Sequence, residues 1–299
     1  MKSDVFYWVL NLSIHGSLVC LLIWALRAIR RIPRRLVYLL WLGPLVRLTV
    51  PFGTSLPWSV MGLLRRLGSR TVTIPASGGW VTTNTLQAAD SYFPIVYRTD
   101  ALRGLFEACA MIWCIGAAAC VLTMAALYWM TLRELRDTKP LGDGVYASEK
   151  VASPGLVGVL RPRILVPQGF DGKLLRYVLA HERVHKKRLD NLWRLIALAV
   201  CCVHWFNPVV WYSLKLFFTD MELSCDEAVT RRLSGPKRRE YALALLSAAQ
   251  GRDLFVSAFG GAKLRLRVER VLSYRRLSGG AAVVFAALTA AVLTVLISG

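Results

Sequence analysis

Two histidines, His181 and His185, are four residues apart, and the stretch 174–180 before them has helical character without proline or glycine. At that spacing both imidazoles leave the same face of an α-helix. Two such imidazoles can bind one zinc ion through nitrogen at about 2.0–2.1 Å. Glu182, beside the first histidine, has the position of a general base that takes a proton from an attacking water. The segment 181–185 therefore predicts a zinc-dependent peptidase.

A pair of carboxylates further along the chain supports this interpretation. Glu222 and Asp226 are also four residues apart, which is the E-x-x-x-D arrangement of zinc peptidases with a glutamate as third ligand. Glu222 is predicted to complete a His2Glu site with the fourth position open for water, and Asp226 to orient a ligating histidine through its second nitrogen. Asp190 is a further candidate for that supporting role, and a helix-terminal or salt-bridge role is equally open. Together the two pairs favour one zinc ion per chain over a solvated helix face.

The segment 192–218 between the two pairs is strongly apolar. A single membrane crossing there would separate His185 from Glu222 by about 30 Å, too far to share one metal ion. His204 and Pro208 fall near its middle, where a helix breaks or kinks. The segment is therefore predicted to form two membrane-associated helices joined at His204–Pro208. A structural or hydrogen-bonding role is expected for His204, because a fourth protein ligand would close the open position.

The composition places this site in a membrane protein. Hydrophobic residues make up 55% of the chain, and the mean hydropathy is +0.46. Four segments are apolar enough to span a bilayer, approximately 5–26, 36–50, 105–130 and 281–297. The second is short and contains Pro44 and Arg47; Arg47 and Glu107 are expected to pair or to reach the interface, in a structural role. The first is not interpreted as a cleaved signal peptide, and the seven cysteines do not suggest a disulfide framework.

The net charge of +20 is concentrated beside the apolar segments. Arginines 27, 30, 31, 34 and 35 directly follow the first segment, which is typical of a cytoplasmic flank and not of direct nucleic-acid binding. This predicts that the N-terminus lies outside. The predicted parts are two spans with a basic cytoplasmic loop (1–53), an extracellular loop (54–103), a third span (104–130), a cytoplasmic protease domain that includes helices 192–218 (131–280), and a fourth span (281–299).

Four ordered pieces of the sequence resemble the BlaR/MecR family of membrane zinc metallopeptidases, the signal transducers of inducible β-lactam resistance and their relatives. Residues 153–158 with 162–167 are similar to the strand pair before the family's catalytic helix. The other pieces resemble the active-site helix (181–191), the signature turn (204–208) and the third-ligand helix (222–227).

The resemblance implies a bacterial cell-membrane protein with four transmembrane helices, its N-terminus outside, and a cytoplasmic gluzincin-like α+β protease domain between spans three and four. It assigns His181, His185 and Glu222 as zinc ligands, Glu182 as the catalytic base and Asp226 as a supporting residue. It also implies autoproteolysis and the direct or indirect cleavage of a cytosolic winged-helix repressor, which is antirepressor signalling in antibiotic resistance.

The sensor members of that family continue after the last span into an extracellular penicillin-binding domain, whereas this sequence ends at Gly299. The resemblance is therefore to a form without that domain, and the residues present do not support β-lactam sensing. For self-cleavage, the candidate is the glycine-containing stretch 251–262, within the wider region 251–280, because an extended glycine-rich backbone is what a protease binds as a strand.

Two other functions stay open. A housekeeping membrane zinc protease of the CAAX-processing or quality-control type would share both pairs of site residues, although segments 154–167 and 205–208 favour the regulatory family. A non-catalytic membrane receptor or scaffold with a structural zinc would have no need of Glu182. The expected partners are the lipid bilayer and a protein substrate, and a homodimer is also open.

Overall fold

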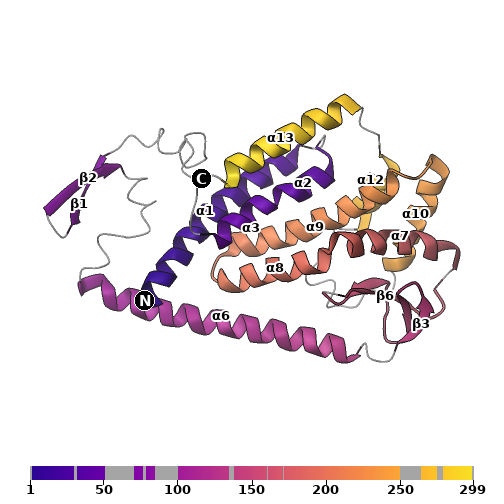
Figure 1. Cartoon of the computed structure of the whole chain (residues 1–299), viewed down its shortest axis with the longest axis horizontal. Helices are drawn as coiled ribbons and strands as arrows, with labels where there is room; N and C mark the ends of the chain where they lie inside the picture. Colours follow the sequence, from indigo (N-terminus) through magenta and orange to yellow (C-terminus); the bar gives the residue numbers. More distant parts are fainter. Residues whose placement is uncertain are drawn as a thin grey trace.

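The chain is mainly helical in the computed structural model, as the sequence predicts (Figure 1). The structure describes residues 2–29, 32–50, 71–76, 79–84, 100–134, 138–159, 161–170, 172–249, 264–274 and 279–297. A small sheet and the helices around it gather at one end, at the right of Figure 1, and the long apolar helices extend away from it. The candidate self-cleavage stretch 251–262 lies outside the described residues.

Two helices in the described part of the chain are long and apolar enough to cross a membrane. The first is α1 (Lys2–Ala28), and the second is α6 (Asp100–Glu134). They coincide with the predicted first and third spans. Half of the most apolar stretch of α1 is buried inside the protein, but only 6% of the corresponding stretch of α6 is buried. Most of the apolar surface of α6 therefore faces outward.

The predicted second and fourth spans are also helical, but neither is among the two helices that are long and apolar enough to cross in the described part of the chain. The predicted second span is divided into two short helices, α2 (Arg34–Leu40) and α3 (Leu42–Thr49), which are joined at Trp41. Pro44 lies in the first turn of α3, where a missing backbone N–H removes no helical hydrogen bond, so the helix restarts there. At the fourth, α13 (Gly279–Ile297) contains a shorter apolar run, Val283–Val292. Four crossings therefore stay a prediction.

The apolar segment 192–218 is divided between two helices, α8 (Asp190–Val203) and α9 (Pro208–Thr230). The break lies where the sequence predicts it, because Asn207 accepts a hydrogen bond from the Val209 N–H and Pro208 starts the next helix. His204 is buried in the turn, and its Nε2 donates to the Leu48 carbonyl oxygen at 2.9 Å. That bond is a structural role of the kind expected for this histidine.

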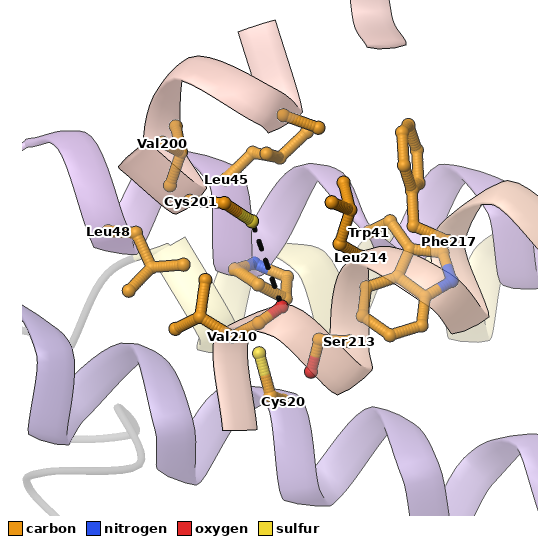
Figure 2. Close-up of a pocket in the computed structure, with 12 residues that line it drawn as sticks. Cys20, Trp41, Leu45, Leu48, Val200, Cys201, Val210, Ser213, Leu214 and Phe217 are labelled. Carbon is orange, nitrogen blue, oxygen red and sulfur yellow. Dashed lines mark hydrogen bonds between the residues drawn. The ribbon is translucent and has the colours of Figure 1, made fainter. Parts of the chain in front are cut away.

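Helices α1, α3, α8 and α9 share one apolar core. Its buried members come from all four, including Ile23, Leu48, Val200 and Met221. A pocket in this layer is lined almost entirely by apolar side chains and by the thiols of Cys20 and Cys201 (Figure 2). All seven cysteines of the chain are free, and four of them are buried. Helices α8 and α9 thus pack against the first apolar helix.

The sheet lies before the histidine helix in the sequence and supports it in space. Its strands are ordered β3 (Lys139–Gly142), β4 (Val145–Ser148), β6 (Arg163–Pro167) and β5 (Gly155–Val157). The last two are antiparallel, which agrees with the strand pair expected there. A separate hairpin, β1 (Thr71–Ala76) and β2 (Gly79–Asn84), falls in the loop 54–103.

Helix α7 (Gly172–Arg188) is packed on both sides. Leu175 and Leu179 contact the core of the sheet, and Tyr177 and Val178 contact α10 (Gly235–Ala249) and α12 (Leu264–Leu272). The helix is therefore held between two apolar layers. The face that it buries also includes its two histidines.

Candidate metal centre

The three predicted zinc ligands come together where α7 packs against α9. His181 and His185 lie on the buried face of α7, and Glu222 faces them from α9. The two Nε2 atoms are 3.0 Å apart. The carboxylate oxygens of Glu222 lie 3.4 Å from Nε2 of His181 and 3.6 Å from Nε2 of His185. Three donor atoms from two helices thus face one small volume.

The outer nitrogen of His181 is held by Asp226 and Tyr241. Asp226 Oδ1 lies 3.2 Å from His181 Nδ1, and the Tyr241 hydroxyl lies 2.9 Å from the same nitrogen while donating to Asp226 at 2.6 Å. A carboxylate only accepts, so Nδ1 carries the proton and Nε2 keeps its lone pair toward the cluster. This is the orienting geometry predicted for Asp226.

Asp190 holds the outer nitrogen of His185 in the same way. Its Oδ2 is 2.6 Å from His185 Nδ1, and its side chain is completely buried. Leu189 separates α7 from α8 and adopts the left-handed conformation, with φ 54° and ψ 41°, which is uncommon for a residue with a bulky side chain. The turn brings Asp190, the first residue of α8, back toward the histidine. The supporting role that the sequence left open for Asp190 therefore agrees with its contacts.

The donor set fits a zinc ion. The two Nε2 atoms are 3.0 Å apart, and each lies 3.4–3.6 Å from one of the two carboxylate oxygens of Glu222. Bonds of 2.0–2.1 Å in tetrahedral geometry place neighbouring ligand atoms about 3.3 Å apart. Burial lowers the pKa of His181, but hydrogen bonds to Asp226 and Glu222 outweigh the burial and raise that pKa to about 9. The cluster thus attracts positive charge, and its nitrogen and carboxylate donors are those that zinc accepts.

A second group of metal-binding residue types, His185, Asp190 and Cys225, adjoins the first. Its contacts are those of a hydrogen-bond network. The His185 Nδ1 and Asp190 Oδ2 atoms are 2.6 Å apart, closer than two ligands of one metal ion. Burial raises the pKa of the Cys225 thiol well above its ordinary value, so the thiol keeps its proton and donates to Asp190 at 3.4 Å. Asp190 and Cys225 thus hold His185 in place through hydrogen bonds.

Glu182 lies on the same buried face of α7 as the two histidines and is 8% exposed. It directly follows His181, so its side chain leaves the helix about a quarter-turn away from that ligand. From α8, Arg194 donates to Glu222 Oε1 at 2.8 Å and holds the carboxylate from the other side. The proposed base and the three proposed ligands are thus all within one packed unit.

Four residues in contact with the centre were not singled out from the sequence: Tyr38, Arg194, Tyr241 and Arg267. Arg267, from α12, donates to both carboxylate oxygens of Asp226, at 2.7 and 2.8 Å. Its guanidinium also lies 3.3 Å from Glu222 Oε2 and from His181 Nε2. In the sequence it is one basic residue in a basic stretch, and no spacing relates it to the histidines.

The comparison with known families agrees with this arrangement. The family model described as BlaR1 peptidase M56 matches residues 7–270, which include the helices and strands that form the centre. The chain therefore belongs to the BlaR1 peptidase M56 family. The resemblance that the sequence motifs indicate is confirmed.

Two curated relatives are regulatory or resistance proteins by name. The Regulatory protein BlaR1 of Bacillus licheniformis is 38% identical over 102 residues, which are 33% of this chain and 17% of that protein. The Methicillin resistance mecR1 protein of Staphylococcus aureus is 24% identical over 103 residues, which are 33% of this chain and 18% of that protein. The matched segments thus span less than a fifth of each relative.

Proposed function

We propose that this chain is a zinc-dependent endopeptidase of the membrane, with His181, His185 and Glu222 as metal ligands and Glu182 as general base. The observation that carries the proposal is the convergence of two imidazole nitrogens and a carboxylate, with the facing nitrogen and oxygen atoms 3.0–3.6 Å apart, in a chain that belongs to a peptidase family. Two histidines and a glutamate that converge in this way are the ligand set of one class of catalytic zinc site.

Zinc bound there would polarise the peptide carbonyl and lower the pKa of a water molecule. The remaining work belongs to side chains of this chain. Asp226 and Asp190 keep the two imidazoles in the tautomer that exposes Nε2. Glu182 accepts the proton of the attacking water and passes it to the leaving amine. The Arg267 guanidinium compensates the charge of Asp226 and Glu222.

A location in the membrane is supported by α6. Its large apolar side chains project outward along its length, and more than half of the surface of each is exposed: Leu105, Met111, Ile112, Ile115, Val121, Leu122, Trp129 and Met130. A surface of this extent is unfavourable in water and suits lipid. With the arginines that follow α1, it supports the predicted multi-pass orientation in a bacterial cell membrane.

The biological role that we propose is transmembrane signalling by proteolysis. The names of the two relatives point to regulation and antibiotic resistance. Autoproteolysis within 251–280, cleavage of a cytosolic winged-helix repressor and assembly as a homodimer are parts of this proposal. Membership of the BlaR1 peptidase M56 family favours it over a housekeeping protease or a non-catalytic scaffold.

The test compares the full chain with its Glu182→Gln variant, both purified in detergent. Zinc is measured by mass spectrometry, and cleavage is followed on the chain itself and on a co-expressed repressor. We expect close to one zinc ion per chain in both proteins and cleavage products only in the wild type. Chelator treatment of the wild type should remove both the metal and the products.

Glu149→Gln is the matched control, because Glu149 is an exposed glutamate that pairs with the exposed Lys139, 3.8 Å away. It should cleave like the wild type. Cleavage by Glu182→Gln at the wild-type rate would show that Glu182 is not the general base. A wild-type chain that binds no zinc under conditions where it remains folded would overturn the proposal.

A further inference from the structure

Helix α2 reaches the metal centre from the side opposite the sheet. The Tyr38 hydroxyl donates to Asp190 Oδ1 at 3.0 Å. The other oxygen of Asp190 is 2.6 Å from His185 Nδ1. One carboxylate therefore joins α2 to a proposed zinc ligand, although Tyr38 and Asp190 are 152 positions apart. No motif in the sequence relates them.

The ring of Tyr38 is fixed from two sides. It is stacked on Phe217 of α9, with centroids 5.6 Å apart and an interplanar angle of 15°. The guanidinium carbon of Arg188 lies 4.3 Å from the ring centroid, and Arg188 also donates to Asp190 Oδ1 at 3.2 Å. These contacts hold the hydroxyl toward Asp190. Removing the hydroxyl alone would leave both ring contacts in place.

Helix α2 packs along α9 (Figure 1), and one buried carboxylate of α9 accepts hydrogen bonds from both ends of α2. Asp220 is completely buried and accepts hydrogen bonds from Arg27, Arg34 and Trp41. Such a carboxylate is costly to separate from its partners, so α2 and α9 are held in one relative position.

A second anchor lies on α9 about two helical turns beyond Asp220. Glu227 Oε2 accepts from the backbone N–H groups of Arg34 and Arg35, at 2.8 and 3.4 Å. Asp220 and Glu227 bracket Glu222 and Asp226 along the same helix. The segment that follows α1 thus contacts α9 at Asp220 and at Glu227. Through Tyr38 it also contacts Asp190, the residue that holds His185.

We propose that Tyr38 is a positioning residue of the metal centre, which sets Asp190, and through it His185, according to the position of α2. The proposal rests on the proposed function, since His185 has to be a ligand. A displacement of α2 relative to α9 would then change the geometry of the proposed ligands. The ion pairs of Asp220 with Arg27 and Arg34 hold α2 in its present position against α9.

The experiment uses the full chain in detergent with the variant Tyr38→Phe, which removes only the hydroxyl. Tyr177→Phe is the matched control. Tyr177 is on α7 itself and donates to a carboxylate, Glu240, at 2.6 Å, but this carboxylate is exposed and contacts no proposed ligand. Two quantities are measured: the zinc dissociation constant by chelator competition, and the visible spectrum of the Co²⁺-substituted protein.

We expect Tyr38→Phe to weaken zinc binding by about three- to tenfold and to shift the Co²⁺ bands, because one hydrogen bond to the supporting carboxylate is lost. Asp190→Asn should have a larger effect, on the order of 10–100-fold. Tyr177→Phe should match the wild type in both measurements. A Tyr38 that serves stability alone would lower the unfolding temperature of the metal-free protein and leave both quantities unchanged.

The outcomes separate the two proposals. If the wild type binds zinc and Tyr38→Phe has the wild-type affinity and Co²⁺ spectrum, the positioning role of Tyr38 is wrong and the zinc site stands. If the wild type binds no zinc, the proposed function fails and the positioning role fails with it. The unfolding transition of the metal-free Tyr38→Phe variant shows whether this variant is folded.

Discussion

Arg267 and Asp226 form a buried ion pair beside the proposed ligands, with side chains 4% and 3% exposed. Asp226 is held well below its ordinary pKa, because the neighbouring Arg267 charge outweighs the effect of burial. A buried carboxylate of this kind depends on its partner, since it has lost its hydration. Arg267 comes from α12, which lies within the wider region 251–280 proposed for self-cleavage.

Replacing Arg267 with Met should therefore destabilise the protein strongly. We expect the free energy of unfolding to fall by about 3–5 kcal/mol, because the buried Asp226 loses its guanidinium partner. The measurement is chemical unfolding of the metal-free chain in detergent.

Arg265→Met is the control, because Arg265 lies on the same helix and its pair with Glu269 is exposed to solvent. This variant should unfold like the wild type. Equal losses in the two variants would show that α12 itself, and not the buried pair, determines the effect.

At the scale of elements, α6 is docked through a close approach to the turn between α8 and α9. A Cβ atom on Gly116 would lie 2.3 Å from the Trp205 ring, so the glycine lets the indole contact the helix backbone. Trp205 also donates to the Trp113 carbonyl at 3.2 Å, and Trp113 donates to the Val203 carbonyl at 2.8 Å. The largely exposed α6 is thus attached at this turn as well as along α1.

Gly116→Ala should loosen this attachment even though alanine is the better helix former. We expect a loss of about 1–3 kcal/mol in the free energy of unfolding, because the rigid indole has to move. Thermal unfolding in detergent measures it, with tryptophan fluorescence reporting on the turn.

Gly104→Ala is the matched substitution on the same helix, and nothing lies within 4 Å of its Cβ position. It should be neutral or stabilising by up to about 1 kcal/mol through helix propensity. A Gly116→Ala variant as stable as Gly104→Ala would contradict the tight contact.

At the scale of the whole molecule, the proposed orientation in a membrane rests on the outward apolar face of α6 and on the arginines after α1. Val283, Val284 and Leu288 of α13 are also more than half exposed, which adds a second outward apolar face. Lipid is the surrounding that satisfies both faces. The metal centre lies at the end of the molecule that carries the sheet (Figure 1).

Reporter fusions test the orientation. Alkaline phosphatase needs disulfides and should be active when fused after residue 90, whereas green fluorescent protein should fluoresce when fused after residue 150. The opposite pattern, with phosphatase active after residue 150, would place the peptidase part outside the cell. Immunoblots of each fusion control for expression.

The local part of the centre was predictable from sequence, because helical spacing alone determines which side chains share a face. His181 with His185, and Glu222 with Asp226, are each separated by one helical turn. The break at Asn207–Pro208 was predictable for a similar reason, since a capping residue before proline is a local signal. The resemblance to a family was carried by these same segments.

The rest required tertiary structure, because it depends on contacts between distant segments. Tyr38 meets Asp190 across 152 positions, and Arg267 meets Asp226 across 41. Neither Tyr38 nor Arg267 is part of a local sequence pattern that would indicate its partner. Only the packing of α2 and α12 against α9 selects the carboxylate that each one contacts, and hydrophobic burial along whole helices decides that packing.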